Sequence, residues 1–257
     1  MGKHWIEDQV VIVTGGASGI GQAIAIEAAS KGAKVVIVDI NESAGNETIS
    51  NITQEGGQAV FSNTDVTNSK SIEVMVKAAA EMGPIKYLGN SAGLQTYGTV
   101  ETTTEEAWDT TMDVNLKSMF LVSQQVIPQI RINHGGGIVN ISSVQGLKSQ
   151  KNVLAYATSK GAAISLTRSM GIDHAAEGIS VNCICPGSID TPMLRYGAGE
   201  HGNPDEVIKE WGSHHPIGRI GSPDEIAKTV MFLWSPDSSF MVGQPVVVDG
   251  GLGSIIL

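Results

Sequence analysis

Short apolar runs alternate along the chain with longer segments whose apolar positions repeat at helical spacing. The apolar runs, which predict strands, cover residues 10–14, 34–39, 59 to about 65, 87–90, 138–142, 180–184 and 246–249. The helical patterns cover residues 20–31, 42–55, 69–82, 105–131, 156–175 and 224–234. Continuous apolar strands that alternate with helices are typical of a parallel sheet buried on both faces. The pattern therefore predicts an α/β fold, a single doubly wound domain over 1–257 with about seven strands.

One stretch departs from this alternation, from about residue 188 to residue 222. It is rich in glycine, proline and histidine, and it contains a single short helical pattern, over 204–211. Long loops in compact domains are usually lids or binding loops. Because the stretch follows the carboxyl end of a predicted strand, where ligands bind in open α/β sheets, we expect it to be a substrate-binding lid.

Composition and charge narrow the classes of partner. The chain is 41% hydrophobic but only 5% aromatic, so its core must consist mainly of Val, Ile, Leu and Ala. With 16 basic and 26 acidic residues the net charge is −10, which argues against nucleic acid or an anionic membrane as a partner. No apolar run approaches the roughly 20 residues that span a bilayer. Cys183 and Cys185 share one apolar run, so we expect free buried thiols and, with no signal peptide, a cytoplasmic protein.

Three glycines, Gly15, Gly19 and Gly21, stand between the first predicted strand and the helix that follows. Glycine lets the chain turn tightly and lets a pyrophosphate approach the backbone, and the helix N-terminus supplies N–H groups to it. The spacing is G-x3-G-x-G, and no Lys-Ser/Thr pair follows, so this is not a P-loop. The alternative interpretation is an ordinary tight turn between a strand and a helix.

Acidic residues at the ends of the next two strands extend this pattern. Asp39 closes the second strand, where a carboxylate accepts hydrogen bonds from an adenosine ribose. The same charge would repel a 2′-phosphate and no arginine lies nearby, so NAD rather than NADP is the predicted cofactor. Asp65, at the end of the third strand, is a candidate for contact with the adenine ring. Each aspartate has a simpler alternative, as a helix cap or a turn residue.

The stretch from Ile138 to Lys160 carries the candidate chemistry. An apolar run ends in Ser142 and Ser143, and Tyr156 and Lys160 then stand four residues apart at the start of a helical pattern. Residues at i and i+4 share a helix face, so we expect the ammonium to lower the pKa of the phenol from about 10. A serine hydroxyl can hydrogen-bond the same substrate oxygen. The stretch predicts an acid/base catalyst for alcohol–carbonyl interconversion.

These segments match those of a known family in order and spacing. The chain resembles a short-chain dehydrogenase/reductase over almost its whole length. The matching segments are Thr14-Gly15-Gly16-Ala17-Ser18-Gly19-Ile20-Gly21, Asn90-Ser91-Ala92-Gly93, Asn115, Ser142-Ser143, Tyr156-x-x-x-Lys160 and Pro186-Gly187. One position departs, because the family usually has a second asparagine where Ser91 stands. The resemblance implies a Rossmann-type fold and a homotetramer, with the helices of Asn115 and Tyr156 between subunits and residues 250–257 near another interface.

The resemblance also implies a role for each matching residue. Tyr156 would be the general acid/base, and Lys160 would bind the nicotinamide ribose and lower the pKa of the tyrosine. Asn115 would complete a proton relay through water. Ser143 would hold the substrate oxygen, because the family spacing selects it over Ser142 and strand alternation turns the two to opposite faces. The residues expected to bind NAD are Gly15, Ser18, Gly19, Ile20, Gly21, Asp39, Asp65, Val66, Asn90, Ala92, Gly93, Tyr156, Lys160, Pro186, Gly187, Ile189 and Thr191.

The positions that flank the reaction centre in this family carry four carboxamides, Gln95, Gln145, Gln150 and Asn152. An unpaired buried amide costs roughly 1–3 kcal/mol, so an apolar substrate would suit this pocket poorly. We therefore expect a small sugar or polyol; the alternative is that some of these side chains face water. The expected substrate contacts are Gln95, Ser143, Gln145, Gln150, Asn152, Tyr156, Met193 and Trp211.

Two other functions remain as alternatives. Apolar lid residues, Met193 and Trp211 among them, are compatible with a ketoacyl- or steroid-type carbonyl reductase. A non-catalytic NAD-binding scaffold is a second alternative, but the complete set of candidate catalytic residues argues against it. The histidines His201, His214 and His215 lack metal-ligand spacing, so no catalytic metal is expected.

Overall fold

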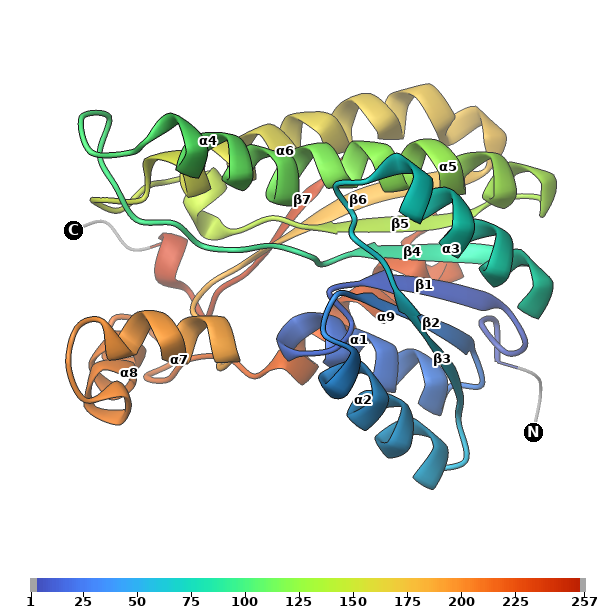
Figure 1. The fold of residues 1–257 in the computed structure, drawn as a ribbon, viewed down its shortest axis with the longest axis horizontal. Coiled ribbons are helices and arrows are strands. Elements are labelled where there is room, and N and C mark those ends of the chain that lie inside the picture. The colour runs from blue at the N-terminus through green and yellow to red at the C-terminus, as the bar shows by residue number, and fades with distance from the viewer. Residues whose placement is uncertain (1–3, 255–257) are drawn as a thin grey trace.

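Seven parallel strands form one sheet in the computed structural model, which describes residues 4–254 (Figure 1). The strands are β1 (Val10–Thr14), β2 (Lys34–Asp39), β3 (Gln58–Asn63), β4 (Ile85–Asn90), β5 (Gly136–Ile141), β6 (Ile179–Pro186) and β7 (Pro245–Val248). Their order in the sheet is β3-β2-β1-β4-β5-β6-β7, and every adjacent pair is parallel. The predicted α/β fold with about seven strands is confirmed.

Helices cover both faces of the sheet (Figure 1). One face carries α1 (Gly19–Ser30), α2 (Glu42–Gln54) and α9 (Pro223–Trp234); the other carries α3 (Ser69–Met82), α5 (Ser118–Ile132) and α6 (Leu154–His174), with α4 (Glu105–Met112) beside α6. All five residues of β1 are buried between these layers. Each face has its own apolar cluster, in which Val, Ile, Leu and Ala predominate. Continuous apolar strands follow from this two-sided burial.

The order of the strands places a binding crevice at the carboxyl ends of the strands, which are called the carboxyl edge of the sheet below. The chain builds β2 and β3 on one side of β1 and then crosses to β4 on the other side. At such a switch point the loops after the strands diverge and leave room for a ligand. The loops after β1, β4, β5 and β6 all end at this edge, so the glycine loop and Ser143 come together there.

The predicted helix over 105–131 is interrupted by a π-helical turn, Asp113–Lys117, between α4 and α5. The Asn115 side chain lies in this wide turn and is completely buried. A π turn adds one residue to a helical turn, and such turns are frequent at functional sites. Apolar periodicity cannot reveal the interruption, because helical spacing resumes at once in α5.

The segment 188–222 contains two helices, α7 (Pro192–Gly199) and α8 (Pro204–Ser213), so the prediction of a single helix there is wrong. α7 begins after Thr191, whose Oγ1 accepts a hydrogen bond from the Leu194 N–H at 3.2 Å. Proline follows at the first helical position, which is a typical helix start. Two glycines within the eight residues of α7 obscure its apolar pattern. Both helices project beyond the carboxyl edge of the sheet (Figure 1).

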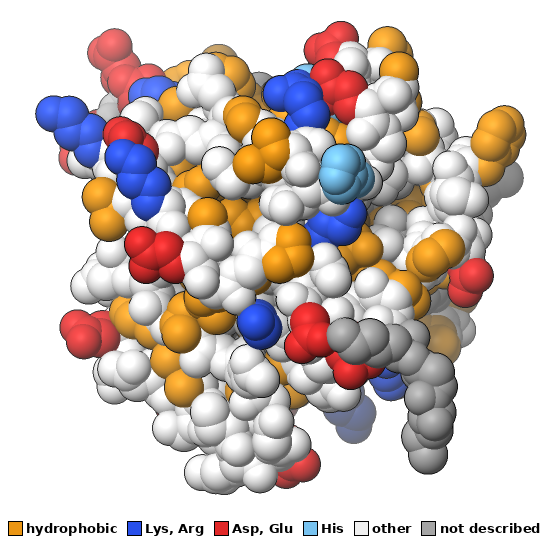
Figure 2. All heavy atoms as spheres, turned by 90° about the vertical axis from the view of Figure 1, so that its right-hand side faces the viewer, with side chains coloured by type: hydrophobic (Ala, Val, Ile, Leu, Met, Phe, Trp, Pro, Cys, Tyr) orange, Lys and Arg blue, Asp and Glu red, His pale blue; other side chains and the backbone are white. Residues whose placement is uncertain are grey.

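The surface formed at the amino ends of the strands lies opposite the carboxyl edge of the sheet. Acidic and basic side chains are interspersed with apolar ones over it, without a continuous basic stripe (Figure 2). Within residues 4–254, no helix is both long enough and apolar enough to cross a membrane. Cys183 and Cys185 are buried free thiols on β6, as predicted.

Candidate active site

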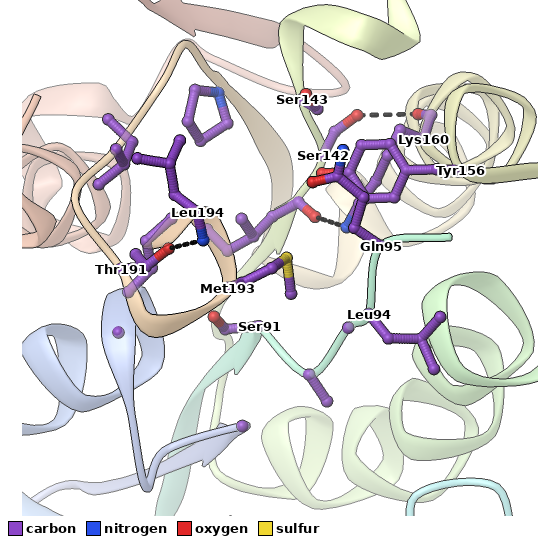
Figure 3. A pocket seen from close by; sticks show the side chains of 18 of the residues that line it. Ser91, Leu94, Gln95, Ser142, Ser143, Tyr156, Lys160, Thr191, Met193 and Leu194 are labelled. Atoms are coloured by element: carbon purple, nitrogen blue, oxygen red, sulfur yellow. Dashed lines mark hydrogen bonds between the residues drawn. The ribbon is translucent and has the colours of Figure 1, made fainter. Parts of the chain in front are cut away.

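A cavity of about 790 Å³ occupies the carboxyl edge of the sheet. The loops after β1, β2 and β3 line one end of it, and the loops after β4 and β5, α6 and the start of the lid line the other. Figure 3 shows the second end: Tyr156 and Lys160 come from α6, while Met193 and Leu194 approach from the lid. The cavity therefore brings together segments that are far apart in the sequence.

Tyr156 and Lys160 lie in the first two turns of α6, one turn apart on the same face. The Lys160 ammonium is 5.5 Å from the centroid of the tyrosine ring, and it donates a hydrogen bond to the Ile141 carbonyl at 2.9 Å. Ser143, just beyond the end of β5, hydrogen-bonds the Tyr156 hydroxyl, and its own Oγ accepts from the Gln145 N–H at 3.1 Å. A tyrosine hydroxyl, a serine hydroxyl and a buried ammonium thus share one end of the cavity.

The electrostatics of this group differ from the prediction. Burial raises the pKa of Tyr156 above its ordinary value, although the hydrogen bond from Ser143 acts in the opposite direction. Burial also lowers the pKa of Lys160 to about 8. The expectation that Lys160 depresses the pKa of the phenol is therefore wrong for the protein alone. The ammonium sits beside the ring and bonds a backbone carbonyl, and desolvation of the hydroxyl is the larger effect.

The two serines have different contacts. The Ser142 Oγ donates a hydrogen bond to the Lys160 backbone carbonyl at 2.8 Å, and this bond ties α6 to the end of β5. The Ser143 hydroxyl instead interacts with that of Tyr156. Of the two hydroxyls, only that of Ser143 is hydrogen-bonded to the candidate acid/base.

Asn115 lies behind the cavity wall rather than on it. Its Oδ1 accepts from the Leu94 N–H at 2.8 Å, and its Nδ2 donates to the Leu94 carbonyl at 2.8 Å and to the Ser159 Oγ at 3.1 Å. The amide therefore clamps the loop after β4 to α6. The proton relay through water that the family resemblance implies stays a prediction.

The other end of the cavity fits a dinucleotide. Gly15 has a φ of +65°, and a Cβ there would lie 2.8 Å from the backbone of Ala92. Gly19 has a φ of +56° and begins α1, whose N-cap Ser18 makes no side-chain cap hydrogen bond. The first N–H groups of this helix are therefore open to an anion. Asp39 closes β2 at the same end, and its Oδ2 accepts from the Ala17 N–H at 3.2 Å.

Most residues predicted to bind the cofactor line the cavity. Those that do are Gly15, Ser18, Gly19, Ile20, Asp39, Asp65, Val66, Ala92, Gly93, Tyr156, Lys160, Pro186, Gly187, Ile189 and Thr191. Gly21 and Asn90 lie outside it. A Cβ on Gly21 would lie 2.1 Å from the Gly15 carbonyl oxygen, so Gly21 permits close packing within the turn. The Asn90 amide bonds the Asn140 Oδ1 at 2.8 Å between neighbouring strands.

Asp65 lines the cavity, and its carboxylate also makes the hydrogen bonds of a turn residue. Its Oδ1 accepts from the Thr67 N–H at 2.8 Å and from the Thr67 Oγ1 at 2.7 Å. This agrees with the simpler alternative for Asp65 and leaves its contact with adenine a prediction.

The substrate end contains some of the predicted contacts and not others. Gln95, Gln145, Gln150 and Met193 line the cavity, and Figure 3 labels Gln95 and Met193 there. Asn152 and Trp211 do not line it. Asn152 occupies a left-handed backbone conformation, with φ of 66°, and its carbonyl accepts from the Gly98 N–H. The Trp211 ring packs edge-on against His201, with ring centroids 6.1 Å apart, inside the lid.

Several cavity residues near the substrate end were not predicted, among them Lys148, Leu252 and Gly253. The Lys148 ammonium donates a hydrogen bond to the Gly253 carbonyl, which joins the loop after β5 to the C-terminal segment. The position of Lys148, between Ser143 and Tyr156, was a local signal for it; nothing local pointed to Leu252 or Gly253. Residues 255–257, part of the segment expected at a subunit interface, lie outside the described residues. Among residues 4–254 no cluster of three His, Cys, Asp or Glu side chains could hold a metal ion.

Comparison with known proteins gives the family. A family model described as enoyl-(acyl carrier protein) reductase matches residues 15–253. The chain is 40% identical to an uncharacterized oxidoreductase of Thermotoga maritima, over 95% of this chain and 97% of that protein. It is 35% identical to 2-(S)-hydroxypropyl-CoM dehydrogenase 3 of Xanthobacter autotrophicus, over 97% and 98%. It is also 35% identical to dehydrogenase/reductase SDR family member 6 of Rattus norvegicus, over 96% and 98%.

Solved structures agree with these relatives. The ligand-free aldohexose dehydrogenase of Thermoplasma acidophilum superposes with a TM-score of 0.89 at 37% identity, covering 99% of this chain and 98% of that one. Levodione reductase superposes with a TM-score of 0.94 at 30% identity, covering 98% and 100%. The chain therefore belongs to the short-chain dehydrogenase/reductase family of alcohol–carbonyl oxidoreductases, whose members bind NAD(P).

Proposed function

We propose that the protein is an NAD-dependent dehydrogenase that interconverts a secondary alcohol and a carbonyl on a small sugar or polyol. One observation carries the proposal: Tyr156, Ser143 and Lys160 stand at one end of a cavity whose other end holds the glycine loop and Asp39. A nicotinamide dinucleotide that spans this cavity would supply the hydride chemistry.

The side chains of the chain itself supply the proton chemistry. In oxidation, the Tyr156 oxygen takes the hydroxyl proton of the alcohol while the carbinol hydrogen leaves as hydride and the carbonyl forms. Ser143 holds the substrate oxygen beside the phenol, so that a hydrogen-bond donor already points to the oxygen on which charge develops. The buried Lys160 ammonium supplies positive charge next to this group.

The choice of NAD rests on Asp39. Its carboxylate lies at the end of β2, on the wall of the cavity, and is held there by the Ala17 and Asn41 N–H groups. A carboxylate in this position accepts hydrogen bonds from a ribose diol and repels a 2′-phosphate.

The choice of a sugar or polyol rests on the three glutamines of the substrate end, Gln95, Gln145 and Gln150. The similarity to an aldohexose dehydrogenase agrees with it. Leu94, Met193 and Leu194 also line the cavity, and they favour a second candidate, a carbonyl reductase for apolar substrates.

Substitution of Tyr156 by phenylalanine tests the proposal. We expect Tyr156→Phe to lower kcat for NADH formation by about 10²–10⁴-fold, the usual contribution of a general acid/base, while the fold is kept. Tyr196→Phe is the matched control, because Tyr196 is 74% exposed on α7 and lies outside the cavity. Rates are measured on the best substrate from a panel of sugars, polyols and apolar alcohols. An unchanged rate in Tyr156→Phe would show that this tyrosine is not the catalyst.

A further inference from the structure

We propose that the substrate is a polyhydroxy carboxylic acid, whose carboxylate binds Lys148 and whose second hydroxyl binds Gln145. The inference rests on the proposed function and narrows its substrate class from neutral polyols to anionic ones. It depends on two features of the cavity wall that the acid/base chemistry does not use: a cation that pairs with no carboxylate of residues 4–254, and a buried amide oxygen that has no hydrogen-bond partner among the same residues.

The first feature is the charge distribution along the cavity. Its acidic lining residues, Asp39 and Asp65, both lie at the cofactor end. At the substrate end the charged lining residues are Lys148 and Lys160, and the Lys160 ammonium is already bonded to the Ile141 carbonyl. The chain carries a net charge of −10, so an anion needs local positive charge to bind. The substrate end supplies that charge, and no carboxylate of the described residues lines this end to oppose it.

Lys148 is positioned to provide this charge. Its side chain is exposed at the cavity wall, and its ammonium donates to the Gly253 carbonyl. No carboxylate within residues 4–254 pairs with it. An ammonium has three N–H donors, and the single bond to Gly253 leaves two for a ligand. One ammonium matches the single charge of a carboxylate.

The second feature is the side chain of Gln145. Its Oε1 is buried and has no hydrogen-bond partner, and its amide makes no other side-chain bond within the described residues. A buried polar atom that lacks a partner destabilises the empty site, so a ligand group that bonds it gains affinity. A hydroxyl both donates and accepts, so it satisfies a carboxamide in either orientation of the amide.

The burial of three wall residues, Ser143, Gln145 and Lys148, indicates the order in which the substrate carries its own groups. Ser143, Gln145 and Lys148 lie within one short segment after β5, and all three line the cavity. Ser143 is buried next to Tyr156, Gln145 is partly buried and Lys148 is exposed. From the inside outward, the wall therefore offers a place for the reacting carbinol, for a neighbouring hydroxyl and for a terminal carboxylate.

Matched pairs of substrates test the inference. NADH formation is measured on aldonates and on alditols of equal carbon number, gluconate against glucitol and threonate against threitol. We expect kcat/KM to favour the acid of each pair by about tenfold or more. Lys148→Gln should reduce this preference by about tenfold, mainly through KM, while Lys148→Arg, which keeps the charge, should retain it. Lys151→Gln is the control, because Lys151 is exposed on the same loop and lies outside the cavity.

The outcomes separate the inference from the function on which it rests. Preference for the acids, lost in Lys148→Gln and kept in Lys148→Arg, supports the inference. Equal turnover of acids and alditols, or an acid preference that survives Lys148→Gln, overturns it and leaves the dehydrogenase function intact. Failure of every member of the panel to yield reduced cofactor with either NAD or NADP overturns both.

Discussion

The pair Tyr156 and Lys160 combines two opposing electrostatic effects. Burial favours the neutral form of each group, so it raises the pKa of the phenol and lowers that of the ammonium to about 8. At neutral pH the tyrosine is therefore protonated in the free protein, ready to act as an acid in carbonyl reduction. In alcohol oxidation it must first lose its proton.

The two directions of the reaction should consequently respond differently to pH. We expect kcat/KM for alcohol oxidation to rise between pH 6 and pH 8, because the raised pKa keeps the deprotonated tyrosine scarce in this range. We expect kcat/KM for carbonyl reduction to stay level over the same range and to fall above about pH 8, where Lys160 loses its charge. Steady-state rates in both directions check this. An oxidation profile that is flat from pH 6 to pH 8 would contradict the assignment of Tyr156 as the base.

Asp39 should set the choice of nucleotide. We expect the wild type to use NAD with a kcat/KM at least about tenfold above that for NADP. Asp39→Asn keeps an acceptor for the local N–H groups but removes the charge, so it should reduce the NAD preference about tenfold. Glu42→Gln is the matched control, because this exposed carboxylate in the first turn of α2 lies outside the cavity. Preference of the wild type for NADP would refute the role given to Asp39.

At the scale of elements, the π turn between α4 and α5 positions the reaction centre indirectly. Asn115 in this turn bonds both backbone groups of Leu94, and Gln95 follows directly on the cavity wall. Asn115→Ala leaves both groups without their partner, and we expect a loss of about 2 kcal/mol in the free energy of unfolding. Thr110→Ala, an exposed change in α4, should alter it by less than about 0.5 kcal/mol. Urea unfolding provides the measurement.

The kinetics of Asn115→Ala distinguish two roles for the Asn115 side chain: holding the loop after β4 in place, as a clamp, and carrying protons, as a relay. A clamp holds Gln95 in place, so its loss should raise KM. A relay moves protons, so its loss should lower kcat while the stability stays near that of the wild type. Unchanged stability in Asn115→Ala would therefore contradict the clamp and favour the relay.

The elements also show what local sequence pattern can predict. Strands buried on both faces and glycine turns have strong local signals, so the sheet, the glycine loop and the Tyr156–Lys160 spacing were all foreseen. Residues of one motif can nevertheless have different roles: Asn90 and Gly21 belong to the same sequence segments as cavity residues, but their contacts serve packing. The contact of Lys148 with Gly253 spans 105 positions, and no local pattern encodes such a distance. The pKa of Tyr156 depends on burial, which spacing alone does not give.

At the scale of the whole molecule, exposed apolar side chains occur on both faces of the sheet. On one side Phe120 of α5 is 48% exposed and Ile172 of α6 is 77% exposed. On the other side Phe232 of α9 and Val247 of β7 are 44% and 46% exposed, and Phe240 between these elements is fully exposed. Exposed apolar residues that cluster on helix and edge-strand surfaces are typical of subunit interfaces. Two such surfaces on each chain could form two different two-fold interfaces with other copies of the chain. A tetramer is built from interfaces of this kind.

We therefore propose that the protein is a homotetramer, with a mass in solution about four times the 26.9 kDa of the chain. Phe120→Asp places a charge on one surface only, so it should break one type of contact and leave a dimer held by the other. Val60→Asp is the control, because Val60 is 42% exposed on β3, which lies at the opposite edge of the sheet from β7 and away from α5 and α6. Size-exclusion chromatography with light scattering distinguishes these states. A wild-type monomer would refute the proposal, and a Phe120→Asp tetramer would exclude the α5 surface as an interface.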